Sequence, residues 1–145
     1  MALNLIKLCV GCESIDHFAQ WQARRLADLR RRGEPAELKH TTRMTPKRRD
    51  ELIDGGSLYW VIKGFIQARQ KLLDIRPFTD AEGIRRCHLI LDEKMVAVAP
   101  RPYRAFQGWR YYPAKDAPPD LYATAQGAED MPSELRRELA ELGLL

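Results

Sequence analysis

The pattern of apolar and polar positions predicts a β-rich chain with a long amphipathic helix near its start. Residues 3–10 are almost continuously apolar, which predicts a strand that Gly11 ends. Ser14 then suits the N-cap of a helix, and Gly33 ends that helix after three consecutive arginines. The apolar residues of this helix share one face about 140° wide. They are Ile15, Phe18, Ala19, Ala23, Leu26 and Leu29.

A short strand and a short helix follow this first unit. Residues 38–44 suit a strand, and residues 46–54 suit a helix with Thr45 as its cap and Pro46 at its first position. Gly55 and Gly56 end this helix.

The middle of the chain predicts four more strands. Residues 57–63 are rich in aromatic and β-branched residues, and residues 65–75 continue as a long, bulged strand, although their apolar residues would also suit a helix. Residues 85–91 and 95–99 are expected to pair through a tight turn at residues 92–94.

These elements predict a fold of the α+β class with five or six strands, arranged as a small mixed β-barrel or curved sheet. The N-terminal helix, the short helix before the central hairpin and a C-terminal helix at residues 134–142 complete it. We expect residues 1–121 to form one globular domain and residues 122–145 to form an acidic C-terminal segment that carries the last helix.

Composition places the chain among soluble globular proteins. Apolar residues make up 45% of the 145 residues and charged residues 30%. No apolar run approaches the roughly 20 residues of a membrane span. The start of the chain has no basic leader, so we expect a cytoplasmic protein whose three cysteines are reduced, with no membrane partner.

Charge is unevenly distributed along the chain. The net charge is 24 − 20 = +4, but residues 24–49 hold ten basic and three acidic residues. Residues 116–145 hold seven acidic and two basic residues. This asymmetry predicts a basic working surface and an acidic C-terminal segment.

Four stretches resemble an uncharacterised bacterial family, domain of unknown function 1489, known mainly from alphaproteobacteria. They are LIKLCVG, HTTRMTPKR, GGSLYWVIKGFIQARQ and RAFQGWRYY. The resemblance implies no activity, since the family has none assigned. A weaker likeness, to PUA-type and ASCH-type barrels, comes from the short helix, the Gly-led strand and the basic strand after it. That likeness implies a small barrel that binds RNA or modified bases.

The sequence gives little support for a metal site or a catalytic site. Cys9 and Cys12 form a C-x-x-C, but Cys87 and His88 are neighbours in a strand and would point to opposite faces, so we expect no metal. The cysteines are interpreted as buried free thiols. No base for a Cys12 nucleophile is evident, and no catalytic residue or cofactor is predicted.

Basic and aromatic residues form the candidate site. Around the short helix, hydroxyls, cations and backbone N–H groups would meet phosphates, and arginines of residues 101–112 would do the same. The phosphate or anion ligands are His40, Thr41, Thr42, Arg43, Lys47, Arg48, Arg49, Arg101, Arg104 and Arg110. The rings expected to stack on bases are Tyr103, Phe106, Trp109, Tyr111 and Tyr112. The competing interpretation is that these rings anchor the segment to the core.

Three functions stay open on the sequence. The first is a non-catalytic or accessory nucleic-acid-binding domain, with RNA or another polyanion as partner. The second is a small enzyme or binding protein for an anionic metabolite or nucleotide, with a pocket around His40 and Arg43. The third is a protein-interaction module.

Overall fold

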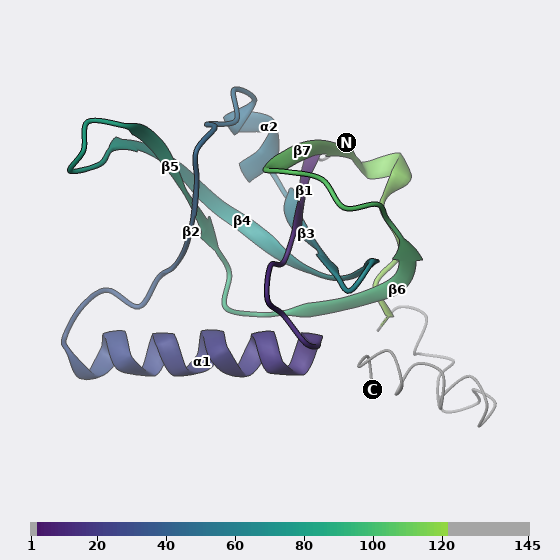
Figure 1. Ribbon diagram of the computed structural model, residues 1–145, viewed down its shortest axis with the longest axis horizontal. Coiled ribbons are helices and arrows are strands. Elements are labelled where there is room, and N and C mark those ends of the chain that lie inside the picture. The colour runs from purple at the N-terminus through teal and green to yellow at the C-terminus, as the bar shows by residue number, and fades with distance from the viewer. Residues whose placement is uncertain (1–2, 122–145) are drawn as a thin grey trace.

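A computed structural model describes residues 3–121 as a seven-stranded sheet crossed by one long helix (Figure 1). The elements in chain order are β1 (Leu3–Leu8), α1 (Ile15–Arg31), β2 (Leu38–Thr42), α2 (Arg49–Ile53), β3 (Ser57–Ile62), β4 (Phe65–Thr79), β5 (Arg85–Leu91), β6 (Val96–Pro102), β7 (Trp109–Pro113) and a 3-10 turn at Ala114–Asp116. The sequence predicted a fold of the α+β class that consists mostly of strands, and this class is confirmed. No helix within residues 3–121 is long and apolar enough to cross a membrane.

The long strand β4 organises the sheet. Its first half pairs with β3 on one edge and with β6 on the other, and its second half pairs with β5. The order β2-β5-β4-β3-β1-β7 is an open path, with β6 beside β4. β1 and β3 are parallel, whereas the other pairs are antiparallel. The expected long, bulged strand is therefore confirmed, with register shifts in its pairing to all three neighbours.

The sheet buries side chains on both of its faces. On β3, Leu58, Trp60 and Ile62 enter a large core cluster that also holds Phe18 of α1. Tyr59 and Val61 point the other way, into a second and smaller cluster. This alternation follows from the two-residue period of a strand, and it leaves all six residues of β3 buried.

Helix α1 forms as its sequence predicts. The Ser14 hydroxyl accepts a hydrogen bond from the backbone N–H of His17 at 3.1 Å, which caps the helix. Asp16 lies in the first turn and Arg30 and Arg31 lie in the last, where each charge favours the helix dipole. Phe18 is buried toward the sheet, so α1 covers one of its faces.

A buried amide network fixes α1 to the sheet. Gln70 of β4 is fully buried, and its Oε1 accepts hydrogen bonds from Trp60 Nε1 and Gln22 Nε2, both at 3.0 Å. Its Nε2 donates to Gln22 Oε1 at 2.7 Å and to the carbonyl of Asp92 at 3.0 Å. Every hydrogen-bonding position of the Gln70 amide is therefore used, which a buried polar group requires.

The predicted hairpin at residues 92–94 is wrong. β5 and β6 do not pair with each other; both run along one edge of β4, so residues 92–95 are an interruption between two strands. The backbone N–H of Asp92 still bonds the carbonyl of Lys71 at 2.9 Å. A tight turn and an interruption between two strands both favour polar residues such as those at 92–94, so the local sequence does not separate them.

Two other expectations differ from the structure. The short helix begins at Arg49 rather than at Pro46, and no side chain caps it. Residues 109–113, where the sequence analysis placed no strand, form edge strand β7 beside β1, which raises the strand number to seven. The predicted helix at residues 134–142 lies outside the described residues.

Replacing Gln70 by leucine tests the amide network. The variant leaves Trp60 Nε1 and the Gln22 amide buried without partners, so we expect a loss of about 3 kcal/mol of unfolding free energy. The measurement is urea denaturation followed by circular dichroism. Gln67→Leu is the matched control, because Gln67 is also buried on β4 but makes one hydrogen bond, to the Ile62 carbonyl at 2.7 Å, and has an unpartnered Oε1. An equal loss in the two variants would contradict this role for Gln70.

Candidate functional site

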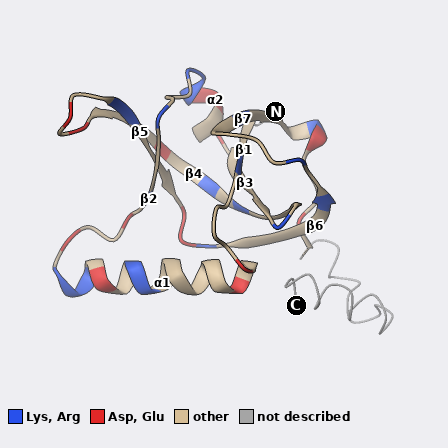
Figure 2. Cartoon of the chain, in the orientation of Figure 1, with Lys and Arg blue, Asp and Glu red and all other residues tan. Residues whose placement is uncertain are grey.

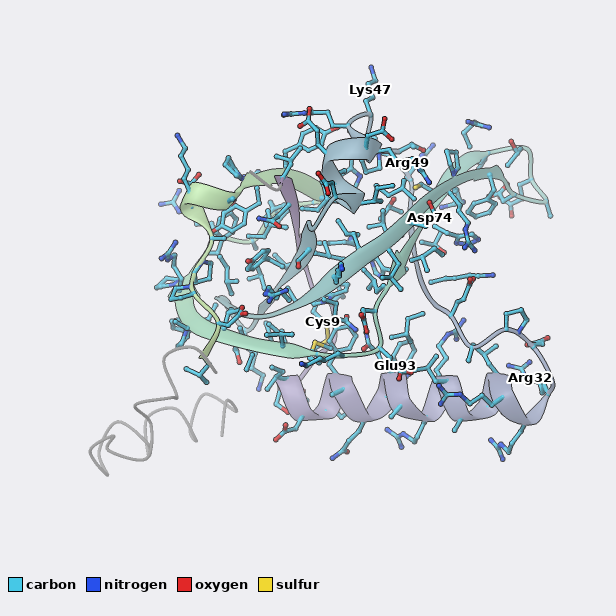
Figure 3. The ribbon with its side chains drawn as sticks, turned by 180° about the vertical axis from the view of Figure 1, so that it is seen from behind. Cys9, Arg32, Lys47, Arg49, Asp74 and Glu93 are labelled. Atoms are coloured by element: carbon cyan, nitrogen blue, oxygen red, sulfur yellow. A yellow bond between two sulfur atoms is a disulfide. The ribbon has the colours of Figure 1, made fainter. Side chains whose placement is uncertain are left out.

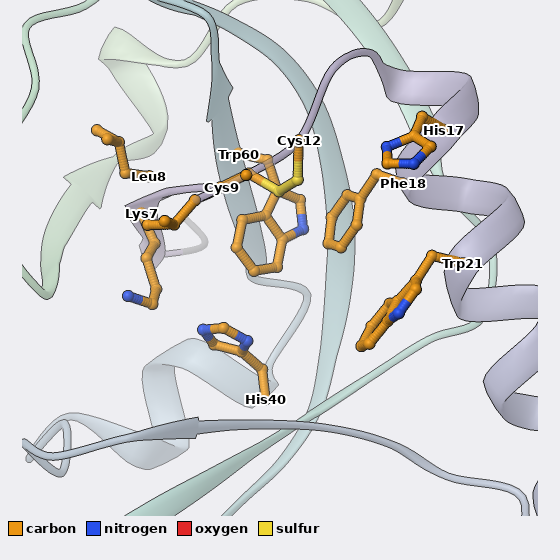
Figure 4. Close-up of a pocket in the computed structure, with 11 residues that line it drawn as sticks. Lys7, Leu8, Cys9, Cys12, His17, Phe18, Trp21, His40 and Trp60 are labelled. Atoms are coloured by element: carbon orange, nitrogen blue, oxygen red, sulfur yellow. A yellow bond between two sulfur atoms is a disulfide. The ribbon is translucent and has the colours of Figure 1, made fainter.

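A cavity of about 420 Å³ lies at one side of the large core cluster, where β1, α1, β2 and β3 approach one another (Figure 4). Its walls are mostly apolar and include the rings of Phe18, Trp21 and Trp60. Three polar side chains also line it: Lys7 of β1, His17 of α1 and His40 of β2. The volume falls in the range of about 300–1,000 Å³ that is typical of small-molecule sites.

Lys7 occupies a position of β1 at which the alternating pattern of the strand predicts an apolar residue. Leu3, Leu5 and Cys9 alternate toward the large core cluster, and Lys7 lies between Leu5 and Cys9 on that same side. Its ammonium forms no ion pair with any residue between 3 and 121. Burial lowers the pKa of Lys7 from its ordinary value, because a half-buried cation loses hydration without gaining a partner. The sequence carries this signal as a lysine within an alternating apolar row, and our sequence analysis missed it.

His40 likewise faces inward from its strand. On β2, Leu38 and Thr42 are buried, whereas Lys39 and Thr41 are exposed, so His40 lies on the inner side. Its imidazole packs roughly perpendicular to the Trp60 ring, with ring centroids 5.0 Å apart. Its Nε2 is buried and has no hydrogen-bond partner. Burial, and secondarily the charge of Lys7, lowers the pKa of His40 from 6.5 to about 4, so the ring is neutral at physiological pH.

Aromatic rings form the remaining walls. Phe18 meets Trp60 edge to face at 4.9 Å and lies roughly parallel to Trp21 at 6.5 Å. Trp21 is 50% exposed, with the guanidinium of Arg25 5.8 Å from its ring centroid. The tryptophan therefore borders the cavity and faces solvent, and it too was missing from the predicted site.

The cysteines differ from the prediction. Cys9 and Cys12 are joined by a disulfide, both are partly exposed, and both line the cavity. The interpretation of them as buried free thiols is therefore wrong. Cys87 is the buried free thiol among the described residues, and burial raises its pKa.

The described part of the chain does not bring a set of metal-binding side chains together. Cys87 is fully buried, whereas His88 stacks on Phe78 and contacts the Thr41 hydroxyl at 3.2 Å, so the two residues face opposite sides of β5. No group of three or more His, Cys, Asp or Glu side chains converges within residues 3–121.

The basic residues around α2 are largely engaged by acidic groups. Arg49 pairs with Asp74 (Figure 3). Arg49 also contacts the carbonyl of Ile75, and Arg48 pairs with Glu51. The Tyr111 hydroxyl accepts hydrogen bonds from the backbone N–H groups of Lys47 at 2.9 Å and Arg48 at 3.4 Å. The Arg48 and Arg49 guanidinium groups and the backbone N–H groups of Lys47 and Arg48 therefore already have partners within the protein, whereas the Lys47 side chain is exposed.

Arg43 does not enter the cavity, although the sequence analysis placed it beside His40. It is exposed at the end of β2, and Thr42 is buried, with its hydroxyl donating to the Met44 carbonyl at 2.9 Å. Thr41 faces outward, toward His88. Of the predicted set, only His40 lines the cavity.

The aromatic segment is anchored to both core clusters. Trp109 is 9% exposed and donates its indole N–H to the Met44 carbonyl at 2.8 Å. Tyr112 is buried and its hydroxyl donates to the Asp116 carbonyl at 2.7 Å. Tyr103 and Phe106 pack against the second cluster, and the Arg110 guanidinium lies 4.5 Å from the Phe106 ring centroid. These positions fit the anchoring interpretation better than a row of open stacking faces.

The arginines of this segment differ in their engagement. Arg101 donates to the Asp116 carbonyl, whereas Arg104 is exposed and contacts no charged residue in the described part of the chain. Over residues 3–121, basic and acidic residues are interspersed (Figure 2). Arg32 and Lys47, both in the basic stretch of the sequence, lie far apart, at the lower right and at the top of Figure 3. The basic stretch thus does not form one continuous surface.

Comparison with known proteins finds a family whose model matches this chain. The model of a family described as protein of unknown function (DUF1489) matches residues 5–145. The chain belongs to this family. The resemblance seen in the sequence is thereby confirmed, and it extends beyond residue 121 to the end of the chain. Comparisons with curated proteins and with solved structures find no match.

The buried His40 predicts a specific pH dependence of stability. Unfolded His40 takes up a proton near pH 6.5, but the folded imidazole resists protonation until about pH 4. The unfolded state therefore binds more protons in this window, and stability falls as the pH is lowered through it. His40→Phe keeps a ring against Trp60 and removes the titrating group, so we expect the variant to lose less stability than the wild type between pH 6.5 and 4.

Denaturation by urea at a series of pH values measures this difference. The two proteins should have parallel stability profiles above pH 7, where both rings are neutral. Parallel profiles all the way to pH 4 would contradict the burial of a neutral His40.

Proposed function

We propose that this protein binds a small anionic ligand with a flat apolar body in the cavity between β1, α1, β2 and β3. The observation that carries the proposal is the pair formed by Lys7, which lacks an ion-pair partner among the described residues, and His40, whose buried Nε2 lacks a hydrogen-bond partner. Both groups enter one apolar cavity. This proposal takes up the second function considered for the sequence, with Lys7 in the place of Arg43.

The electrostatic argument concerns the cost of an unpaired cation. Lys7 loses hydration on folding, and without an opposite charge this loss lowers the stability of the charged form. A carboxylate, sulfonate or phosphate in the cavity would offset that loss. The imidazole of His40 could donate one hydrogen bond to the same ligand, or accept one, depending on its tautomer.

The shape argument concerns the rings. The Trp60 ring is roughly perpendicular to the rings of His40 and Phe18, with interplanar angles of 89° and 84°. A flat aromatic ligand could meet rings in these orientations by offset-stacked or edge-to-face contacts, which aromatic rings prefer. An aromatic acid or a nucleotide base with its phosphate combines both required features.

The proposal assigns no reaction, and three sequence-based hypotheses stand beside it. Nucleic-acid binding by residues 101–112 stays a prediction, and the internal hydrogen bonds of Trp109 and Tyr112 weigh against it. The likeness to PUA-type barrels stays a hypothesis about the fold, on which the proposal does not depend. Cytoplasmic location also stays a prediction.

Lys7→Met tests the charge requirement. The probes are anilinonaphthalene sulfonate, which is anionic and aromatic, and phenylnaphthylamine, its uncharged analogue. Losing the cation should weaken binding of the sulfonate about tenfold, which corresponds to about 1.4 kcal/mol, and should change binding of the neutral probe less than about twofold. Fluorescence titration measures both. Melting by circular dichroism should show that the variant is at least as stable as the wild type, because an unpaired, half-buried cation has been removed.

Lys71→Met is the matched control, because Lys71 is exposed on β4 and lies outside the cavity. It should leave both dissociation constants unchanged. Equal weakening of the two probes by Lys7→Met, or equal effects of the two lysine variants, would reject the proposal. Single-stranded RNA belongs in the same assay: RNA binding that Arg104→Ala and Arg110→Ala weaken, and that Lys7→Met leaves intact, would favour the nucleic-acid hypothesis instead.

A further inference from the structure

The disulfide between Cys9 and Cys12 lies in the wall of the cavity, where the chain passes from β1 to α1 (Figure 4). The Cα atoms of the two residues are 5.8 Å apart, and both side chains are partly exposed. Gly11 adopts a positive φ of 78° between them, which a side chain would disfavour. Val10 is 87% exposed, so the outer side of this loop is open to solvent at that residue.

The fold holds this connection in place without the disulfide. The backbone N–H of Cys9 donates to the Val61 carbonyl at 2.9 Å and extends the pairing of β1 with β3. On the other side, the Ser14 cap begins α1, and Ile15 is buried in the core. A disulfide that encloses two residues also restricts the unfolded chain less than one that closes a long loop. The connection can therefore keep its position whether the cysteines are oxidised or reduced.

Two nearby features favour the thiolate form that exchange requires. Cys12 lies two residues before the N-cap of α1, where the helix dipole favours a negative charge. Lys7 precedes Cys9 by two residues on the same side of β1 and has no ion-pair partner among the described residues. Cys87 offers the opposite environment, since it is fully buried in the apolar core.

We propose that Cys9 and Cys12 form a redox centre that exchanges with low-molecular-weight thiols. An external thiolate attacks the sulfur of one cysteine, the bond between the cysteines breaks, and the other cysteine leaves as a thiolate. A second external thiolate attacks the external sulfur of this mixed disulfide and releases the first cysteine. Two external thiols are oxidised to one disulfide, and their two protons pass to the cysteine pair or to solvent. This inference rests on the cysteines and not on the ligand proposed above.

Redox titration with glutathione tests the proposal on the full chain. Folded protein is equilibrated in buffers of varied reduced-to-oxidised glutathione ratio, alkylated, and analysed by mass spectrometry. We expect one reversible two-electron transition. Cys9 and Cys12 should both be alkylated when they are reduced, and neither should be alkylated when they are oxidised. Cys87 should stay unlabelled until urea is added, which makes it an internal control.

Two variants identify the exchanging pair. In Cys12→Ser, oxidised glutathione should form a mixed disulfide at Cys9, seen as the mass of one glutathione, because no second cysteine can release it. Cys87→Ala should leave the titration unchanged. Circular dichroism should show the same secondary structure in both redox states.

Three results would overturn the redox centre. They are a pair that stays oxidised in excess reduced glutathione, a pair that stays reduced in excess oxidised glutathione, and labelling of Cys9 and Cys12 that begins only with unfolding. None of them changes the expected binding of anilinonaphthalene sulfonate, so the failure of this inference can be told apart from the failure of the proposed function.

Discussion

The buried amide of Gln70 is the interaction on which the rest of the structure depends. Apolar contacts between a helix and a sheet are not directional, so they allow the helix to slide or rotate. The hydrogen bonds from Gln70 to Gln22, Trp60 and the Asp92 carbonyl allow one arrangement of α1, β3 and the interruption between β5 and β6. Phe18, one turn before Gln22, is thereby held against Trp60. The aromatic wall of the cavity is a consequence of this network.

The cavity shows how a fold can carry a site at positions that ordinarily belong to the core. Strand alternation turns Lys7 and His40 inward, toward apolar neighbours that give neither of them a partner. Such a departure from the apolar pattern lowers stability, and proteins retain such departures chiefly at functional sites. The disulfide lies in the same wall, so one short stretch of β1 and its following loop supplies a cation and a cysteine pair.

The aromatic and basic residues of the segment near the end of the chain are compatible with two opposite interpretations. Rings and arginines together suit a single-stranded nucleic acid, but they also suit an edge strand that is fastened by its own hydrogen bonds. Trp109 and Tyr111 reach across to the α2 region, and Arg110 covers Phe106. The cost of leaving an indole N–H or a phenol unpaired in the core explains why each polar end meets a carbonyl or an N–H.

Local patterns in the sequence determined α1 and β3 and favoured a strand over a helix for β4, because capping residues and two-residue or 3.6-residue periods act over a few positions. They also placed Tyr59 and Trp60 on opposite faces of one strand. The same patterns could not separate a hairpin from an interrupted strand at residues 92–95, because that difference depends on which edge of β4 is free to pair. They also could not bring Lys7 to His40. Each inward direction is encoded locally, but the meeting of two inward side chains in one cavity is decided by the crossing of α1 and the pairing of distant strands.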